Sequence, residues 1–144
     1  MRIPATLPGL KPVSGVVGAC AIVWLSLEGA LIRDILLAAV LLATAMAFIV
    51  VRKAGGKTIR QIQTVIVATA SGAIFGAGVA LLTLVLLAVK TSLHAHGPEY
   101  AGWELLWVWR QIPLWSGAGA LLMAGFGLIL ISGKPFADPD GSRD

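Results

Sequence analysis

Four long stretches without a charged side chain divide this chain of 144 residues, and they constrain its fold more than any other feature. They cover residues 12–27, 35–51, 61–89 and 111–133. About 20 apolar residues in a helix cross the hydrocarbon core of a bilayer, which is about 30 Å thick. The third and fourth stretches reach that length alone. The first two need residues from the junction 28–34, which we interpret as a tight helical hairpin.

A buried soluble bundle is the competing interpretation, and the composition argues against it. Hydrophobic residues make up 58% of the chain and charged residues 12%, about half of the ~25% charge usual in soluble domains. Soluble helices also need a polar outer face, whereas the stretch 35–51 has Thr44 as its one polar side chain. Helices that are apolar on all sides belong in lipid, because their backbone groups are hydrogen-bonded internally.

The sequence therefore predicts an all-α polytopic membrane protein with four transmembrane helices. We place these helices near residues 13–31, 33–51, 60–90 and 112–132, in a transmembrane domain that covers 13–133.

A short helix on the outer membrane interface is expected between the third and fourth spans. The segment 99–111 is too short to span a bilayer, and it carries Trp103 and Trp107 one helical turn apart. Tryptophan side chains favour the lipid headgroup region, so these two residues are predicted to anchor the segment there. Because proline blocks a backbone hydrogen bond of a helix, Pro113 is expected to separate this interfacial helix from the fourth span.

The distribution of lysine and arginine predicts the orientation. Eight of the 11 basic residues fall in the segments 1–12, 51–64 and 134–144. Short loops rich in lysine and arginine stay in the cytoplasm, so both termini are expected there, in a multi-pass protein of the inner cell membrane. Three prolines predict an extended arm over 1–12, and the composition of 134–144 predicts a flexible tail. The net charge of +4 favours anionic lipid and gives no indication of nucleic-acid binding.

Small residues recur on one face of each of the last two expected spans. In the third span they are Ala68, Gly72, Gly76 and Ala80, and in the fourth Gly117, Ala120, Ala124 and Gly127. Small side chains let helix backbones approach closely in lipid, where no hydrophobic force drives helices together. We predict that these two small-residue stripes are helix-packing faces.

The expected spans lack the groups that membrane chemistry needs. No acidic, basic or histidine side chain lies deep inside any of them, whereas proton-coupled transporters and voltage sensors require such groups there. Glu28 lies near the outer end of the first span beside Arg33 and Asp34, where we expect a salt bridge of the hairpin. Nothing in the sequence marks an activated nucleophile, so we expect no enzymatic activity.

His94 and His96 form the one cluster with potential for metal binding. In an extended segment both side chains face one way and could bind zinc or copper with Glu99 or Glu104. Two histidines without cysteine are a short ligand set, and the chain has a single cysteine. We therefore expect no cofactor and keep a metal site at His94 and His96 as an alternative.

Taken together, the lack of ionisable side chains inside the expected spans and the small-residue stripes favour a noncatalytic accessory or assembly subunit of a larger membrane complex. Its expected partners are the lipid bilayer and other membrane subunits or a second copy, without nucleic acid. The first alternative is a homo-oligomeric channel or small transporter, with a pore lined by Thr64, Thr69, Ser71 and Thr83. The second is an outer-face metal or cofactor binder that uses His94 and His96.

Overall fold

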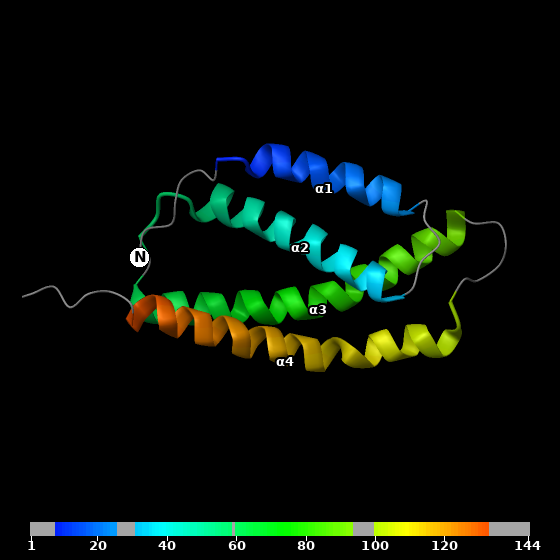
Figure 1. Ribbon diagram of the computed structural model, residues 1–144. Helices are drawn as coiled ribbons and strands as arrows, with labels where there is room; N and C mark the ends of the chain where they lie inside the picture. Colours follow the sequence, from blue (N-terminus) through cyan, green and yellow to red (C-terminus); the bar gives the residue numbers. More distant parts are fainter. Residues whose placement is uncertain (1–7, 26–30, 59, 94–99, 133–144) are drawn as a thin grey trace, which may run out of the picture.

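The computed structural model describes residues 8–25, 31–58, 60–93 and 100–132, and this part of the chain is almost entirely helical. Its helices are α1 (Leu10–Leu25), α2 (Leu31–Ala54), α3 (Gln61–Leu93) and α4 (Gly102–Ser132). Successive helices run in opposite directions, and each packs against the next in the chain (Figure 1). The starts of α1 and α3 therefore lie at the same end of the molecule as the ends of α2 and α4.

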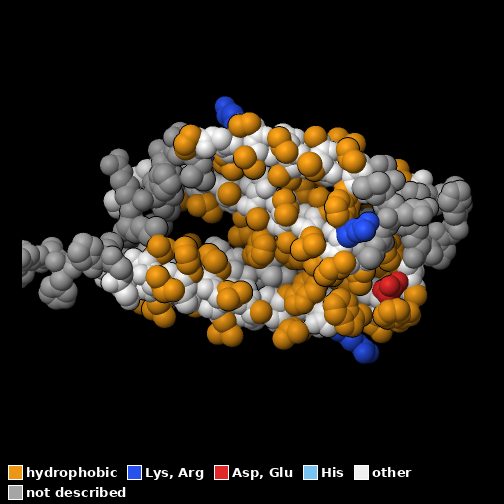
Figure 2. Space-filling model, viewed as in Figure 1, with side chains coloured by type: hydrophobic (Ala, Val, Ile, Leu, Met, Phe, Trp, Pro, Cys, Tyr) orange, Lys and Arg blue, Asp and Glu red, His pale blue; other side chains and the backbone are white. Residues whose placement is uncertain are grey.

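Three of these helices are long and apolar enough to cross a membrane. α2, α3 and α4 contain 24, 33 and 31 residues, or about 36, 50 and 46 Å at 1.5 Å per residue. In Figure 2, hydrophobic side chains cover the middle of the visible face, and the few charged ones lie toward its ends. The prediction of apolar helices of membrane-spanning length is confirmed for these three.

α1 is apolar but short, with 16 residues and a length of about 24 Å. It begins at Leu10, so the predicted extended arm over 1–12 is wrong at its end. Pro12 lies in the first turn of the helix, where a backbone N–H has no helical partner to lose. Residues 26–30, which would lengthen this helix to the predicted span, lie outside the described part of the chain.

The connection between α2 and α3 is short and is built around a glycine turn. α2 continues to Ala54, three residues beyond the expected end, and the chain then turns at Gly56, which has a φ of 78°. Glycine adopts this left-handed conformation without steric cost, so it ends the helix cleanly. α3 begins after Arg60, whose backbone N–H donates to the Oε1 atom of Gln63 at 3.4 Å.

α4 corrects the prediction that Pro113 divides an interfacial helix over 99–111 from the last span. The described residues form one continuous helix, Gly102–Ser132, with Pro113 inside it. Proline removes one backbone hydrogen bond and bends a helix, yet the turns on either side can persist, and α4 is visibly bowed (Figure 1). The rings of Trp107 and Trp115 pack edge to face across this region, with their centroids 6.2 Å apart.

Candidate functional site

The closest helix pair in the molecule is α3 with α4, whose backbones touch at three glycines. A Cβ atom added at Gly72 would overlap the carbonyl oxygen of Gly119, and one added at Gly119 would overlap the carbonyl oxygen of Gly72. A Cβ atom at Gly76 would overlap the carbonyl oxygen of Trp115. No larger residue fits any of these positions unless the helices move apart.

The predicted stripe on α3 lies close to this crossing. Gly72, Gly76 and Ala80 are buried. The Cβ atom of Ala68 lies 3.4 Å from the position that a Cβ atom would take at Gly127 of α4. The structure therefore brings the α3 stripe toward α4 over about three helical turns.

The stripe on α4 is arranged differently. Among its four members, Gly127 is buried against α3, Ala120 and Ala124 are half-buried, and Gly117 lies on the exposed face. The glycine of α4 that touches the α3 backbone is instead Gly119, which is not a member of the predicted stripe. A pattern of small residues four apart could not find it, since the residues four positions away are Trp115 and Met123.

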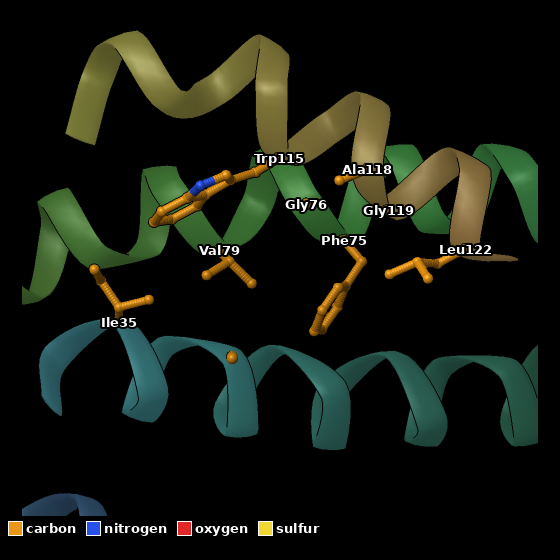
Figure 3. Close-up of a pocket in the computed structure, with 9 residues that line it drawn as sticks. Ile35, Phe75, Gly76, Val79, Trp115, Ala118, Gly119 and Leu122 are labelled. Carbon is orange, nitrogen blue, oxygen red and sulfur yellow. The ribbon is translucent and has the colours of Figure 1, made fainter. Parts of the chain in front are cut away.

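An open apolar groove of about 270 Å³ lies beside this crossing, between α2 and α4. The residues that line it are Ile35 and Ala39 of α2, Phe75, Gly76 and Val79 of α3, and Trp115, Ala118, Gly119 and Leu122 of α4. Figure 3 shows Phe75 and Val79 pointing from α3 toward α2, and Ile35 pointing toward α3 from the opposite side. The groove is therefore floored by α3 and walled by the other two helices.

A buried polar cluster joins the same three helices at one end of the molecule. Asp34 in the first turn of α2, Lys90 in the last turn of α3 and Tyr100 just before α4 are 3%, 1% and 7% exposed. The Tyr100 hydroxyl donates to Asp34 Oδ2 at 2.6 Å and accepts a hydrogen bond from Lys90 Nζ at 3.3 Å. The Lys90 Nζ atom also lies 5.8 Å from the centroid of the Tyr100 ring.

This cluster satisfies the requirements for burying charge. A buried charge is costly unless it is paired and hydrogen-bonded, and each charged group here has the Tyr100 hydroxyl as a partner. Asp34 lies at a helix N-terminus and Lys90 at a helix C-terminus, where the helix dipoles favour their respective charges. The arrangement fixes the ends of α2, α3 and α4 relative to one another.

Asp34 was predicted to lie in a hairpin with Glu28 and Arg33, and its bond to Tyr100, 66 positions away, was not predicted. In the structure Arg33 is exposed, and Glu28 lies outside the described residues. One feature of the sequence could have indicated the contact between Tyr100 and Lys90. Tyr100 is the single tyrosine of the chain, and it follows Lys90 at the outer end of the expected third span.

The remaining candidate residues gather into no further site in the described part of the chain. His94 and His96 lie outside it, and no group of three or more potential metal ligands occurs among residues 8–25, 31–58, 60–93 and 100–132. Of the proposed pore residues, Thr69 and Thr83 donate their hydroxyl hydrogens to carbonyl groups of α3, and Thr64 donates to the carbonyl group of Arg60, just before α3. Ser71 is half-buried. The predicted interfacial anchors Trp103 and Trp107 are 70% and 44% exposed in the first turns of α4.

Comparison of the chain with protein-family models, curated proteins and solved structures gives no match. The functional argument therefore rests on the residues of this chain: the glycine crossing of α3 and α4, the groove beside it, and the buried polar cluster at the end of the three long helices.

Proposed function

We propose that this protein is a noncatalytic accessory or assembly subunit of a membrane complex, which holds a transmembrane helix of a partner protein in the groove between α2 and α4. The groove carries the proposal. It is apolar along its whole lining, and it lies on three helices of membrane-spanning length.

The lining suits a helix because small residues occur on every side of the groove. Ala39 and Ala118 lie on opposite walls, and Gly76 lies on the floor. Helices in lipid associate where small side chains permit close backbone approach, so a partner helix can lie deep between the walls. The larger side chains of Phe75 and Leu122 supply the ridges against which it would pack.

The exposure of α4 supports docking on this side of the molecule. Only 6% of its most apolar segment of 18 residues is buried within the chain, against 33% for α3. A partner helix in the groove would cover part of this surface without displacing any helix of the chain. The glycine crossing holds α3 and α4 together independently, so the groove is already formed before the partner binds.

The proposal also includes the number of membrane spans and the orientation of the chain in the membrane. α1 would form a fourth span together with residues 26–30, and both termini would lie in the cytoplasm of a cell with the chain in its inner membrane. The basic residues support this orientation, since the connection between α2 and α3 carries Arg52, Lys53, Lys57 and Arg60 on or beside it.

The test is native mass analysis after gentle detergent extraction, applied to the wild type and to Ala118→Trp. The tryptophan fills the groove, so the mass of the wild type should exceed that of the chain by one constant partner, and the variant should lose that partner. Leu121→Trp is the matched control, because Leu121 is 76% exposed and does not line the groove. It should keep the partner.

Three results would contradict the proposal. A wild-type mass that equals a multiple of the chain mass, with that multiple lost in Ala118→Trp, would indicate a homo-oligomer and favour the channel or transporter. A monomer with no bound protein, or a complex that both tryptophan variants retain, would show that the groove holds no partner helix.

A further inference from the structure

A second cavity lies where the end of α3 and the start of α4 diverge, away from the groove. It has a volume of about 520 Å³, within the range of small-molecule pockets. Its lining consists of Leu84, Leu87, Ala88, Thr91 and Ser92 of α3 together with Tyr100 and Leu105. The sequence analysis assigned no role to this pocket, and the docking function above does not use it.

Three residues of the lining, Thr91, Ser92 and Tyr100, carry hydroxyl groups whose hydrogens are already used. The Thr91 hydroxyl donates to the carbonyl oxygen of Leu87 at 2.9 Å, and the Ser92 hydroxyl donates to that of Val89 at 2.7 Å. Tyr100 donates its hydroxyl hydrogen to Asp34. A hydroxyl that has given its hydrogen keeps lone pairs, so Thr91 and Ser92 offer acceptors to a ligand.

The rest of the lining is aliphatic and includes Leu84, Leu87 and Leu105. Leu84 lies two helical turns from Thr91 toward the middle of α3. A ligand that fills the whole space therefore needs an apolar part beside the leucines and a hydrogen-bond donor beside the hydroxyls. Since α3 is about 50 Å long and Thr91 is in its last turn, the polar side lies at the end of a membrane-spanning helix.

We propose that this pocket binds one membrane lipid whose headgroup donates hydrogen bonds, with an acyl chain along the leucines and the donor at Thr91 and Ser92. An ammonium headgroup, as in phosphatidylethanolamine, and a hydroxylated one, as in phosphatidylglycerol, share this chemistry. Phosphatidylcholine has no donor, because its nitrogen carries three methyl groups. The inference rests on the three membrane-spanning helices and is independent of the partner helix in the groove.

The experiment is native mass spectrometry of the detergent-purified chain with equal amounts of the three phospholipids added in separate samples. We expect one tightly held phosphatidylethanolamine per chain, with an occupancy constant about tenfold above that of phosphatidylcholine, the factor that one net hydrogen bond supplies. If phosphatidylglycerol binds as well as phosphatidylethanolamine, hydroxyl donors suffice. If it binds like phosphatidylcholine, the ammonium is required.

Substitutions locate the site. Thr91→Val with Ser92→Ala removes both acceptors and should bring phosphatidylethanolamine down to the level of phosphatidylcholine. Thr64→Val is the matched control, because the Thr64 hydroxyl also donates to a backbone carbonyl group but lies at the other end of α3. Ala88→Trp should block the pocket for every lipid, with circular dichroism confirming that the helices form.

Equal binding of phosphatidylethanolamine and phosphatidylcholine to the wild type would overturn the proposal. So would a phosphatidylethanolamine preference that persists in the Thr91→Val, Ser92→Ala variant, whatever the behaviour of Ala88→Trp. Both results are measured as lipid binding to the purified chain, so they do not depend on whether a partner protein occupies the groove.

Discussion

Alanine at Gly72 is the smallest change that tests the contact between α3 and α4. The added Cβ atom would lie 2.7 Å from the carbonyl carbon of Gly119 and from the Cβ atom of Met123, whereas ordinary contacts begin at 3.4 Å. The carbonyl oxygen of Gly119 would lie nearer still, so the helices must separate by more than this difference of 0.7 Å. Overpacking of this kind costs about 1–3 kcal/mol, so we expect the free energy of unfolding of Gly72→Ala to be lower by that amount than that of an alanine variant without the overlap.

Two glycines on α4 provide matched controls. An added Cβ atom at Gly117 or Gly125 has no heavy atom of the described chain within 4 Å. Alanine also raises helix propensity by about 1 kcal/mol relative to glycine, so these controls should keep or gain stability. All three substitutions gain helix propensity, and only Gly72→Ala also introduces an overlap with α4. A loss of stability in Gly72→Ala alone therefore measures the overlap.

The assay is reversible unfolding by a denaturing detergent in mixed micelles, followed by circular dichroism. We expect the double variant Gly72→Ala, Gly119→Ala to lose less stability than the two single losses added together. The first added Cβ atom already moves the helices apart, so the second added Cβ atom causes a smaller overlap. If Gly72→Ala is as stable as Gly117→Ala, the backbones do not touch at this crossing and the reasoning fails.

Three further predictions concern other parts of the chain. Asp34→Ala should destabilise the fold by about 1–3 kcal/mol because it removes the carboxylate that accepts the hydrogen of the buried Tyr100 hydroxyl, and the double variant with Tyr100→Phe should cost clearly less than the sum; additive losses in the same unfolding assay would contradict the coupling. Reporter fusions should show the connection between α2 and α3 in the cytoplasm and the connection between α3 and α4 outside, and the reverse pattern would refute the orientation. His94→Ala with His96→Ala should change stability by less than about 0.5 kcal/mol, and metal analysis of the purified protein should find less than one zinc or copper ion per chain; a tightly held ion that this variant loses would identify a metal site.

The long apolar helices were predictable because membrane-spanning length is a property of single segments. Each of α2, α3 and α4 needs only its own residues to satisfy its backbone hydrogen bonds and to match the bilayer. The end of α2 was predicted only to within three residues, because the helix continues to Ala54 and stops at Gly56, which takes a left-handed conformation that other residues avoid.

The errors arose where a local rule competes with tertiary packing. Proline disfavours a helix interior, yet α4 continues through Pro113, and the contact of Trp107 with Trp115 spans that position. Proline inside membrane helices is tolerated because neighbouring groups and small backbone adjustments compensate for the lost hydrogen bond. The sequence shows the proline but not the contacts that surround it.

The site residues that sequence reasoning missed depend on pairs far apart in the chain. Gly119 matters because it lies opposite Gly72 on another helix, whereas the spacing of small residues within α4 pointed to Gly117, where an added Cβ atom would meet no heavy atom of the described chain within 4 Å. The bond between Asp34 and Tyr100 joins positions 66 residues apart. Charge patterns predict which end of the bundle such groups occupy, but the partner of each is decided by how the helices cross.

The most direct test of the docking proposal is site-specific photocrosslinking in native membranes, with the crosslinking residue at Ala39, Ala118 or Leu121. Ala39 and Ala118 line opposite walls of the groove, and Leu121 lies outside its lining. We predict that Ala39 and Ala118 give one and the same protein adduct, of the mass that native analysis finds bound to the wild type, and that Leu121 does not. Equal adducts at all three positions, or lipid adducts alone at Ala39 and Ala118, would contradict a partner helix in the groove.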